Sequence, residues 1–547
     1  MSLTRLWLVM PVVLLIGAGS VHAQVREVWW HVRAAPGDNE DEAVGIGLDA
    51  GGNCYVAGVS TGSADCDFLV AKYNGSGGVE WEHSINGPGD SSDYAMALEV
   101  DGDGNSFVGG WTATKGVTGQ QALLIKLNTA GEVVWTCKSG IASATVRDLV
   151  TGPSDDIIAV GMGRQGEWNA YATKYSPAGD SLWTKFYKWA GSSGGDGKRG
   201  ACAPDGSVYM AGFVGYGTPV DILTVKMSAD GDTLWGRAYD GPGHGSDAAS
   251  GIAVDNGGNA YVVGKVIGTG GSSDIAVLKY SPAGDLLWDW IYNGSANSTD
   301  EAVGVKLDPD GDICVGGTTS QLGKGHDFAF IKLSPDGDSL LVSYAGVAAT
   351  DDAYAMTLDS NGNVYITGQR PGVASYDYLT MKFDGATGAK VWEMTWDRNG
   401  GYDRGTHVCV GQEDHVYVAG YVNGTSLPDT KNDVGAVAYE PVAAAVFEPS
   451  VNEPPRGFAL HQNSPNPFNA ATTIRFDLET GGAAALSILN ILGQTILTHR
   501  EDDLPAGSYS FEWDGTDMKG RPVASGVYLY RLQGNRQVTS RKMVLLK

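Results

Sequence analysis

The sequence predicts an all-β protein: an eight-bladed β-propeller with four strands in each blade, followed by a C-terminal immunoglobulin-like β-sandwich. Three observations predict this fold class. One short apolar strand recurs eight times, the step between copies is nearly constant, and turn residues separate the strands throughout. Four short antiparallel strands at a period of about 50 residues are typical of a propeller blade. A seven-bladed ring with one divergent unit is the alternative.

The recurring strand ends in glycine in every copy, from CYVAG (54–58) to VYVAG (416–420). Consecutive final glycines are 51 to 53 residues apart. A helical solenoid would instead show apolar residues at a period near 3.6, which is absent. The eight glycines are Gly58, Gly110, Gly161, Gly212, Gly264, Gly317, Gly368 and Gly420.

Each unit contains four strands separated by turns of Asp, Gly and Asn, residues that tolerate tight hairpins. In the first unit, AVGIGL (43–48) precedes the turn DAGGN (49–53), and the recurring strand follows. The third strand is DFLVAKY (67–73), and the fourth contains Trp81. The strands are apolar on both faces, as expected when each blade is stacked between two neighbours.

Third strands begin with an aspartate and contain a lysine five residues later, which places the two side chains on opposite faces of the strand. We expect the lysines to pair with the neighbouring blade or to cover apolar surface with their stems. They are Lys72, Lys226, Lys279, Lys332 and Lys382.

The eighth unit has no Trp-containing fourth strand, and the N-terminal region has the missing piece. VREVWWHVR (25–33) aligns with GVEWEHSI (78–85), which places Trp29 opposite Trp81. We therefore predict that the N-terminal strand completes the last blade and removes an open sheet edge. With this pattern of strands, turns, lysines and tryptophans, the repeats over 26–442 resemble the bacterial β-propeller family of SBBP repeats. The resemblance implies the fold strongly and an activity only weakly.

Residues 1–23 are predicted to be a signal peptide. Arg5 precedes an apolar run, and the small residues Val21 and Ala23 predict cleavage between Ala23 and Gln24. A membrane anchor is the alternative, but the run is short for a span of about 20 residues. No later stretch reaches that length, so no transmembrane segment is expected in the mature chain.

The composition excludes some partners. The chain has 547 residues, 79 of them glycine, and a formal net charge of −26. A negative surface repels nucleic acid and anionic membranes, so no nucleic-acid partner is expected.

The six cysteines show no metal-binding spacing and are expected to be small buried hydrophobes, although the sequence does not choose among the possible disulfide pairings.

The predicted propeller spans 24–441, and a Pro-containing linker is predicted at 442–457. In the remaining stretch, 458–547, short alternating strands such as TTIRFDL (472–478) and GVYLYRL (526–532) predict an Ig-like sandwich.

The motifs of 458–547 resemble a known family. FALHQNSPNPFNAATTIRFDL, ILNILGQTI, LPAGSYSFEWDGTDMKGRPVASGVYLYRL and SRKMVLLK are similar to the C-terminal type A sorting domain of the type IX secretion system. WDGTDMKGRPVASGVYLYRL is also similar to the hook-capping Ig-like domain of flagella. The resemblance implies that the outer-membrane secretion machinery recognises 458–547. It also implies export through the periplasm to the outer surface of a diderm bacterium or to the medium.

Acidic residues recur where the first strands begin, and two interpretations remain open. In a propeller the first strand lines the central channel, so the acids are either a carboxylate ring at its mouth or caps that bond their own blade. Capping is favoured because repetition alone explains the pattern. The residues are Asp41, Glu42, Asp93, Asp247, Asp300, Glu301, Asp351, Asp352 and Asp403.

Two of the first turns place oxygens at alternate positions, as a calcium loop does. A calcium loop also needs glycine at its sixth position, where Ser106 and Ile313 stand. Hairpin chemistry is therefore favoured, Ca²⁺ is the weaker alternative, and no cofactor is predicted with assurance. The candidate ligands are Asp101, Asp103, Asp308, Asp310 and Asp312.

No sequence motif for catalysis occurs with its required context, so catalytic residues are unknown. The leading functional hypothesis is a secreted or surface-displayed module that binds a glycan or a protein, with loops such as GVTGQQ (116–121) and RPGVASY (370–376) as contacts. The alternatives are an exported polysaccharide lyase or hydrolase that uses an acidic channel mouth, and a structural or adhesive surface component.

Overall fold

The computed structural model describes residues 24–33, 41–61, 65–88, 91–115, 118–141, 143–189, 194–215, 219–323, 325–346, 350–373, 375–398, 400–423, 432–442, 448–451, 457–469, 471–517, 523–534 and 537–546. The predicted signal peptide, 1–23, lies outside this part of the chain. Glu27–Pro441 form one compact unit, and Val442–Lys547 belong to a second.

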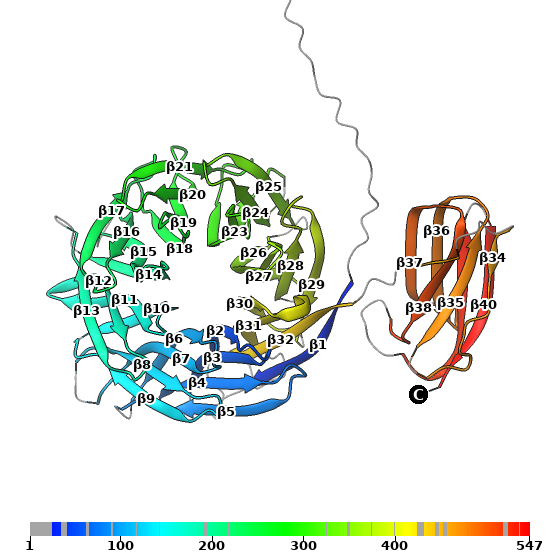
Figure 1. Cartoon of the computed structure of the whole chain (residues 1–547), viewed down its shortest axis with the longest axis horizontal. Coiled ribbons are helices and arrows are strands. Elements are labelled where there is room, and N and C mark those ends of the chain that lie inside the picture. The colour runs from blue at the N-terminus through cyan, green and yellow to red at the C-terminus, as the bar shows by residue number, and fades with distance from the viewer. Residues whose placement is uncertain are drawn as a thin grey trace, which may run out of the picture. The chain divides into compact units, whose positions relative to one another are not determined.

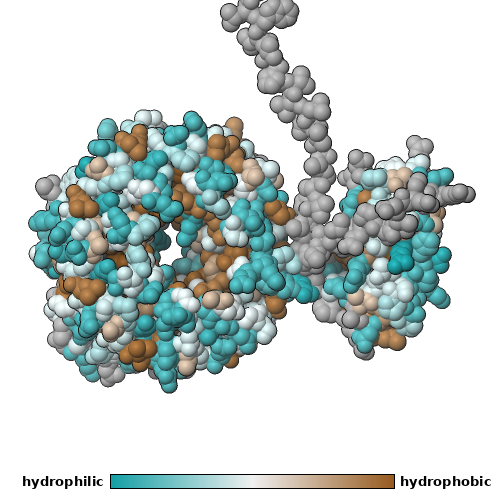
Figure 2. Space-filling view, viewed as in Figure 1, coloured by the Kyte–Doolittle hydropathy of each residue, from teal (hydrophilic) through white to brown (hydrophobic). Residues whose placement is uncertain are grey.

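The described residues of the first unit form eight four-stranded sheets arranged in a ring, which confirms the predicted propeller (Figure 1). The first strands face the centre, and the fourth strands form the rim. Figure 2 shows an opening through the middle of the ring. The first strands are β2 (Glu42–Leu48), β6 (Asp93–Val100), β10 (Ala144–Thr151), β14 (Gly195–Cys202), β18 (Ala248–Val254), β22 (Glu301–Leu307), β26 (Asp352–Leu358) and β30 (Arg404–Val410).

Each first strand pairs with a second strand, which is buried along almost its whole length and pairs in turn with a third. The second strands are β3 (Cys54–Thr61), β7 (Ser106–Thr112), β11 (Ile157–Gln165), β15 (Val208–Val214), β19 (Ala260–Ile267), β23 (Ile313–Ser320), β27 (Val364–Pro371) and β31 (Val416–Asn423). The third strands are β4 (Cys66–Tyr73), β8 (Gln121–Leu127), β12 (Glu167–Tyr175), β16 (Asp221–Met227), β20 (Ser273–Tyr280), β24 (His326–Leu333), β28 (Tyr376–Phe383) and β32 (Asn432–Val442).

The fourth strands include the N-terminal one. They are β5 (Val79–Ile85), β9 (Val133–Lys138), β13 (Ser181–Tyr187), β17 (Thr233–Tyr239), β21 (Leu286–Tyr292), β25 (Ser339–Ala345), β29 (Lys390–Trp396) and β1 (Gln24–Arg33). The last blade has the order β1-β32-β31-β30, so the predicted closure by the N-terminal strand is confirmed. A 3-10 turn, η1 (Gln412–Asp414), lies between β30 and β31.

Trp29 of β1 joins the last blade to the first. Its ring centroid lies 6.0 Å from that of Tyr417 in the last blade and 5.5 Å from that of Tyr73 in the first. Its indole also packs against Gly77, where it occupies the space that a side chain would need, and the φ of +83° at Gly77 also favours glycine. The strand that completes the sheet of the last blade therefore also provides a contact between the last blade and the first.

The same contact recurs around the ring. The indole N–H of a fourth-strand tryptophan donates to a backbone carbonyl in the next blade at 3.0 to 3.2 Å. Three of the expected lysines, Lys72, Lys226 and Lys279, donate to the same carbonyls, which confirms that they pair between blades. The tryptophan–carbonyl pairs are Trp81–Thr129, Trp135–Pro177, Trp183–Ala229, Trp235–Pro282 and Trp288–Pro335.

The eight glycines of the second strands are explained by a β-bulge in each facing first strand. In the second blade the register shifts between Ala95 and Ala97, and the carbonyl of Tyr94 then faces Gly110 so closely that a Cβ would collide with it. Gly212 and Gly420 meet the carbonyls of their own first strands in the same way. Glycine is required at these positions because a backbone oxygen occupies the side-chain space.

The second unit contains two four-stranded sheets with a shared apolar core around Phe511, Trp513 and Tyr530. Their orders are β33-β38-β35-β34 and β37-β36-β39-β40. The strands are β33 (Glu448–Val451), β34 (Ala459–Leu460), β35 (Thr472–Leu478), β36 (Gly482–Asn490), β37 (Thr495–Leu504), β38 (Gly507–Trp513), β39 (Gly526–Gly534) and β40 (Gln537–Leu545). The predicted Ig-like sandwich is confirmed.

Part of the predicted linker differs from expectation, because Glu448–Val451 form the edge strand β33. Pro449 has no N–H to donate. Proline is tolerated on an edge strand because one side of that strand needs no hydrogen-bond donor.

The six cysteines lie on described strands and are all free. Among the described residues, no helix is long and apolar enough to cross a membrane.

Candidate functional site

The first-strand bulges place eight side chains on the wall of the central channel. Each register shift skips one residue, and every skipped residue lines one of three cavities. Arg199 lines all three, so the cavities are parts of one channel. The skipped residues are Val44, Met96, Arg147, Lys198, Ser250, Val303, Tyr354 and Thr406.

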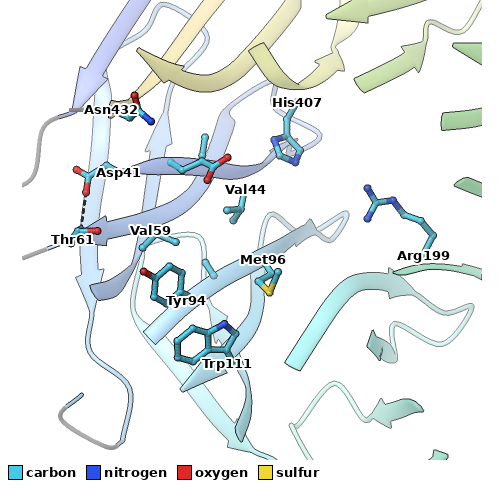
Figure 3. A pocket seen from close by; sticks show the side chains of 13 residues that line it. Asp41, Val44, Val59, Thr61, Tyr94, Met96, Trp111, Arg199, His407 and Asn432 are labelled. Carbon is cyan, nitrogen blue, oxygen red and sulfur yellow. Dashed lines mark hydrogen bonds between the residues drawn. The ribbon is translucent and has the colours of Figure 1, made fainter. Parts of the chain in front are cut away.

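The first cavity, of about 660 Å³, has an aromatic wall (Figure 3). Tyr94 of β6 and Trp111 of β7 are opposite one another in the sheet, and their rings are stacked at 4.7 Å between centroids and 16° between planes. Tyr94 is 37% exposed. The exposed Glu42, together with Asn432, adds polar groups from the first and last blades. This cavity combines a flat apolar platform with hydrogen-bonding groups.

The second cavity, of about 770 Å³, has a cationic wall. Arg147 and Lys198 are the bulge residues of neighbouring blades, and Arg199 follows directly. Burial lowers the pKa of Lys198, and the charges of both arginines lower it further. Arg147 Nη2 lies 3.3 Å from a carboxylate oxygen of Asp196, whose own pKa is raised by burial.

A third cavity of about 250 Å³ brings Asp148, Arg199 and His407 together. Burial lowers the pKa of His407 to about 4, so it is neutral at pH 7. Burial also raises the pKa of Asp148, although Arg199 opposes that rise. Nearby, burial raises the pKa of Glu99 to about 7, and Glu99 accepts a 2.8 Å hydrogen bond from Thr151. A carboxyl with this pKa can hold or release a proton at neutral pH.

The aspartates that begin the first strands act as caps. Asp300 is fully buried and accepts backbone N–H bonds from Gly294 at 2.7 Å and Ser320 at 2.9 Å. Asp247 and Asp403 are capped in the same way, each by two backbone amides. Asp41 and Asp93 each accept one backbone amide, and the fully buried Asp351 is bonded by Arg370.

These aspartates therefore follow the capping interpretation, and a ring of exposed carboxylates at the mouth is not what the described residues show. The acidic neighbours of the caps have separate partners. Glu301 lies 3.1 Å from Lys265, and Asp352 lies 2.7 Å from His326. Only Glu42 of this group faces the first cavity from an exposed position.

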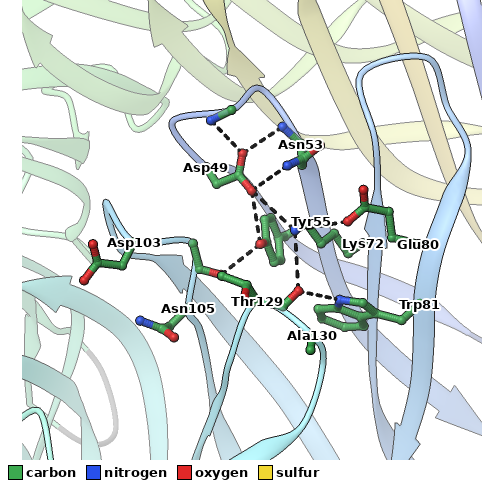
Figure 4. A network of polar contacts seen from close by, with 12 residues as sticks. Asp49, Asn53, Tyr55, Lys72, Glu80, Trp81, Asp103, Asn105, Thr129 and Ala130 are labelled. Carbon is green, nitrogen blue, oxygen red and sulfur yellow. Dashed lines mark hydrogen bonds and ion pairs between the residues drawn. The ribbon is translucent and has the colours of Figure 1, made fainter.

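The turn aspartates are engaged within their own hairpins. Figure 4 shows the first example, in which Asp49 accepts the backbone amides of Gly51 and Asn53 at 2.9 Å and faces Lys72 at 3.5 Å. Among the calcium candidates, Asp101 accepts the amides of Asp103 and Asn105.

The second candidate turn is held in the same way. Asp308 accepts the amides of Asp310 and Asp312, and Lys332 lies 2.7 Å from Asp308 and 3.2 Å from Asp312. Backbone amides therefore bond Asp101 and Asp308, as in a hairpin turn, and an ammonium group lies beside Asp308 and Asp312.

One group of three carboxylates in the described residues has oxygens within 4.8 Å of one another: Asp221, Asp240 and Asp247. Asp247 already uses both of its oxygens to accept backbone amides. We assign no metal to this group.

Comparisons with known proteins give one match to a family model. Residues 464–537 match the model of the FlgD Ig-like domain. No curated protein sequence matches this chain. Among solved structures, Chaetomium thermophilum Sqt1 is 13% identical with a TM-score of 0.46, covering 76% of this chain and 98% of its own.

Two bacterial structures are also similar. A Dyadobacter fermentans protein of unknown function is 13% identical with a TM-score of 0.37, covering 77% of this chain and 100% of its own. PorZ, a surface component of the type-IX secretion system of Porphyromonas gingivalis, is 14% identical with a TM-score of 0.31, covering 94% of this chain and 75% of its own. These TM-scores are too low to support a function.

Sequence reasoning missed the bulge residues, although Asp41 and Glu42 of the first cavity were among its candidates. The bulge residues occupy the same position of every repeat, each 14 residues before the second-strand glycine, but their residue types differ from blade to blade, so no recurring residue marks them. One signal was present: Lys198 and Arg199 are two adjacent charges inside a predicted first strand, where apolar and small residues are the rule. Two loops, 116–121 and 370–376, were expected to contact a ligand. Arg370, in the described part of the second loop, instead donates a hydrogen bond to the cap Asp351.

Proposed function

We propose that the protein is an exported binding module whose propeller holds a saccharide chain at the entrance of its central channel. One observation carries this proposal: the stacked pair of Tyr94 and Trp111 in the wall of an open cavity. A monomer such as a hexose presents a flat apolar face that suits an aromatic platform, while its hydroxyl groups need polar partners around the rim. Glu42 and Asn432 supply such partners in the same cavity.

The platform is built to stay rigid without a ligand. Tyr94 and Trp111 lie on hydrogen-bonded strands immediately beside the bulge, and Cys66 Sγ donates to the Tyr94 hydroxyl at 3.4 Å. A rigid aromatic pair binds with little loss of conformational entropy, and this favours affinity.

Replacing Trp111 with alanine is expected to weaken binding to the recognised polysaccharide by at least about tenfold, because aromatic anchors dominate such interfaces. A glycan array on the mature chain identifies the ligand, and titration calorimetry then measures Kd. Trp290→Ala is the matched control, because Trp290 stacks with Tyr292 on the rim strand β21, away from the channel.

Equal binding by the Trp111→Ala and Trp290→Ala proteins, with both folded by circular dichroism, would contradict the platform. Cleavage of the bound polymer would instead support the enzyme alternative.

We also propose that 458–547 direct export through the outer-membrane secretion machinery to the cell surface or the medium. The support is the set of motifs from NSPNPFN to the terminal SRKMVLLK, together with an Ig-like sandwich in this region. A signal peptide at 1–23, cleaved before Gln24, would provide the first step into the periplasm.

Deletion of 458–547 is expected to trap the protein in the periplasm of its native host. Cell fractionation and protease accessibility of intact cells measure this outcome. The full chain with Trp111→Ala serves as the control, because a binding defect alone should leave export intact. Normal surface display of the truncated chain would refute the sorting role.

A further inference from the structure

A cationic patch lies on the wall of the second cavity and consists of Arg147, Lys198 and Arg199. It stands out because the protein as a whole has a net charge of −26. Bulges in neighbouring first strands turn Arg147 and Lys198 into the same cavity. Like charges brought together repel one another and disfavour the compact state, and a bound anion would relieve that repulsion.

One carboxylate near the cationic patch is less accessible than the cations. Asp196, which pairs with Arg147, is only 3% exposed, whereas the Arg147 side chain is 30% exposed and Arg199 is exposed. Asp148, which is half-buried, lies near Arg199 and accepts the amide of Gly200 at 2.9 Å. Arg199 is therefore the charged side chain of this group that is most open to an entering ligand.

The second cavity also has an apolar part, beside the hydroxyl groups of Ser246 and Ser250. Met162, Phe213 and Val220 line it, and Lys198 Nζ lies 5.3 Å from the centroid of the Phe213 ring. A small anion such as phosphate would leave these side chains without a contact. A sugar ring with an attached carboxylate would contact both the cations and the apolar wall.

The cationic patch is continuous with the aromatic platform. Met96 and Arg199 line both the first and the second cavity. A chain that places one ring on Trp111 can therefore extend toward Arg147 without leaving the channel wall. Cavities of this size accommodate ligands of one to a few rings.

We propose that the saccharide recognised by this propeller is acidic, with the carboxylate of a uronate residue bound by Arg147, Lys198 and Arg199. This inference rests on the proposed saccharide-binding function and specifies its ligand class. It also revises the expectation from net charge, which disfavours polyanions on the surface as a whole but does not describe the channel.

The test uses the mature chain and three polymers, alginate, polygalacturonate and hyaluronan, each beside its carboxyl-reduced form. At least one acidic polymer is expected to bind at least about tenfold more tightly than its reduced form at low salt, because charge-assisted hydrogen bonds are strong. The double variant Arg147→Gln with Lys198→Gln is expected to lose that preference while it still binds the reduced form. Salt should weaken binding of the acidic polymer only.

Lys188→Gln is the matched control, because Lys188 is a cation on the outside of the same blade as Arg147, with its side chain 63% exposed. Equal binding of acidic and reduced polymers would overturn the acidic-ligand proposal and leave the saccharide-binding function intact. An unchanged preference in the double variant would also overturn it. No binding to any of the six polymers would overturn the acidic-ligand proposal, and binding of neutral glycans on the array would then decide the broader function separately.

Discussion

Replacing Trp29 with alanine is expected to destabilise the propeller by about 3–5 kcal/mol, the cost of deleting a large buried aromatic side chain. Trp29 is 8% exposed and lies between Tyr417 of the last blade and Tyr73 of the first. Deletion of β1 should have a larger effect, because β32 would become an open edge that can pair with another chain. Thermal unfolding and size-exclusion chromatography with light scattering measure both outcomes.

Trp30→Ala is the matched control, because Trp30 is the next residue of β1 and is 36% exposed. Its loss removes a contact with the Arg398 guanidinium, 3.4 Å from the ring centroid, worth about 1 kcal/mol. Gly77→Ala adds a second check: its Cβ would collide with the indole, so it should cost less in the Trp29→Ala background, where only the strain of the positive φ at Gly77 remains. Equal effects of Trp29→Ala and Trp30→Ala would mean that closure does not depend on this contact.

Replacing Gly110 with alanine is expected to destabilise the second blade by about 3 kcal/mol or more, because the new Cβ would collide with the carbonyl oxygen of Tyr94. A backbone oxygen cannot move aside as a side chain can, so the pairing of β6 with β7 must break or shift. Binding should fall as well, since Tyr94 and Trp111 are positioned by this pairing. Chemical denaturation and a ligand titration measure the two effects.

Gly102→Ala is the control in the same blade. A Cβ at Gly102 meets no atom within 4 Å, so the change should stay within about 0.5 kcal/mol. If the two alanine variants were equally stable, the bulge would not be the reason that glycine recurs at the end of the second strands.

The fold could be predicted from the sequence because each blade repeats the same local chemistry. Glycines 51 to 53 residues apart, turns such as DGDGN and a tryptophan in the fourth strand recur often enough to specify the blade and its number. The closing strand was predictable for the same reason, since Trp29 falls at the place where the eighth blade lacks its tryptophan. In the second unit, β33 lies where a linker was predicted, because an isolated strand without a repeat is identified only by its neighbours.

The candidate site could not be predicted in the same way. Met96, Arg147 and Lys198 occupy the same position in three successive repeats but differ in residue type, and the bulge that turns each toward the channel is a property of strand pairing. Acidic residues were visible in the sequence, but whether a carboxylate faces solvent or caps an amide depends on atoms from distant segments. Asp300, for example, is bonded by Gly294 and Ser320.

The sequence by itself therefore determined the architecture: the blade, the number of blades, the strand that closes the ring and the Ig-like character of the C-terminal region. Local residue patterns encode these features, and eight copies reinforce them. Only the tertiary structure decided what the channel presents, which is an aromatic platform at Tyr94 and Trp111 beside the cations Arg147, Lys198 and Arg199. The physical reason is that ring closure brings non-repeating residues together from blades that are far apart in the chain.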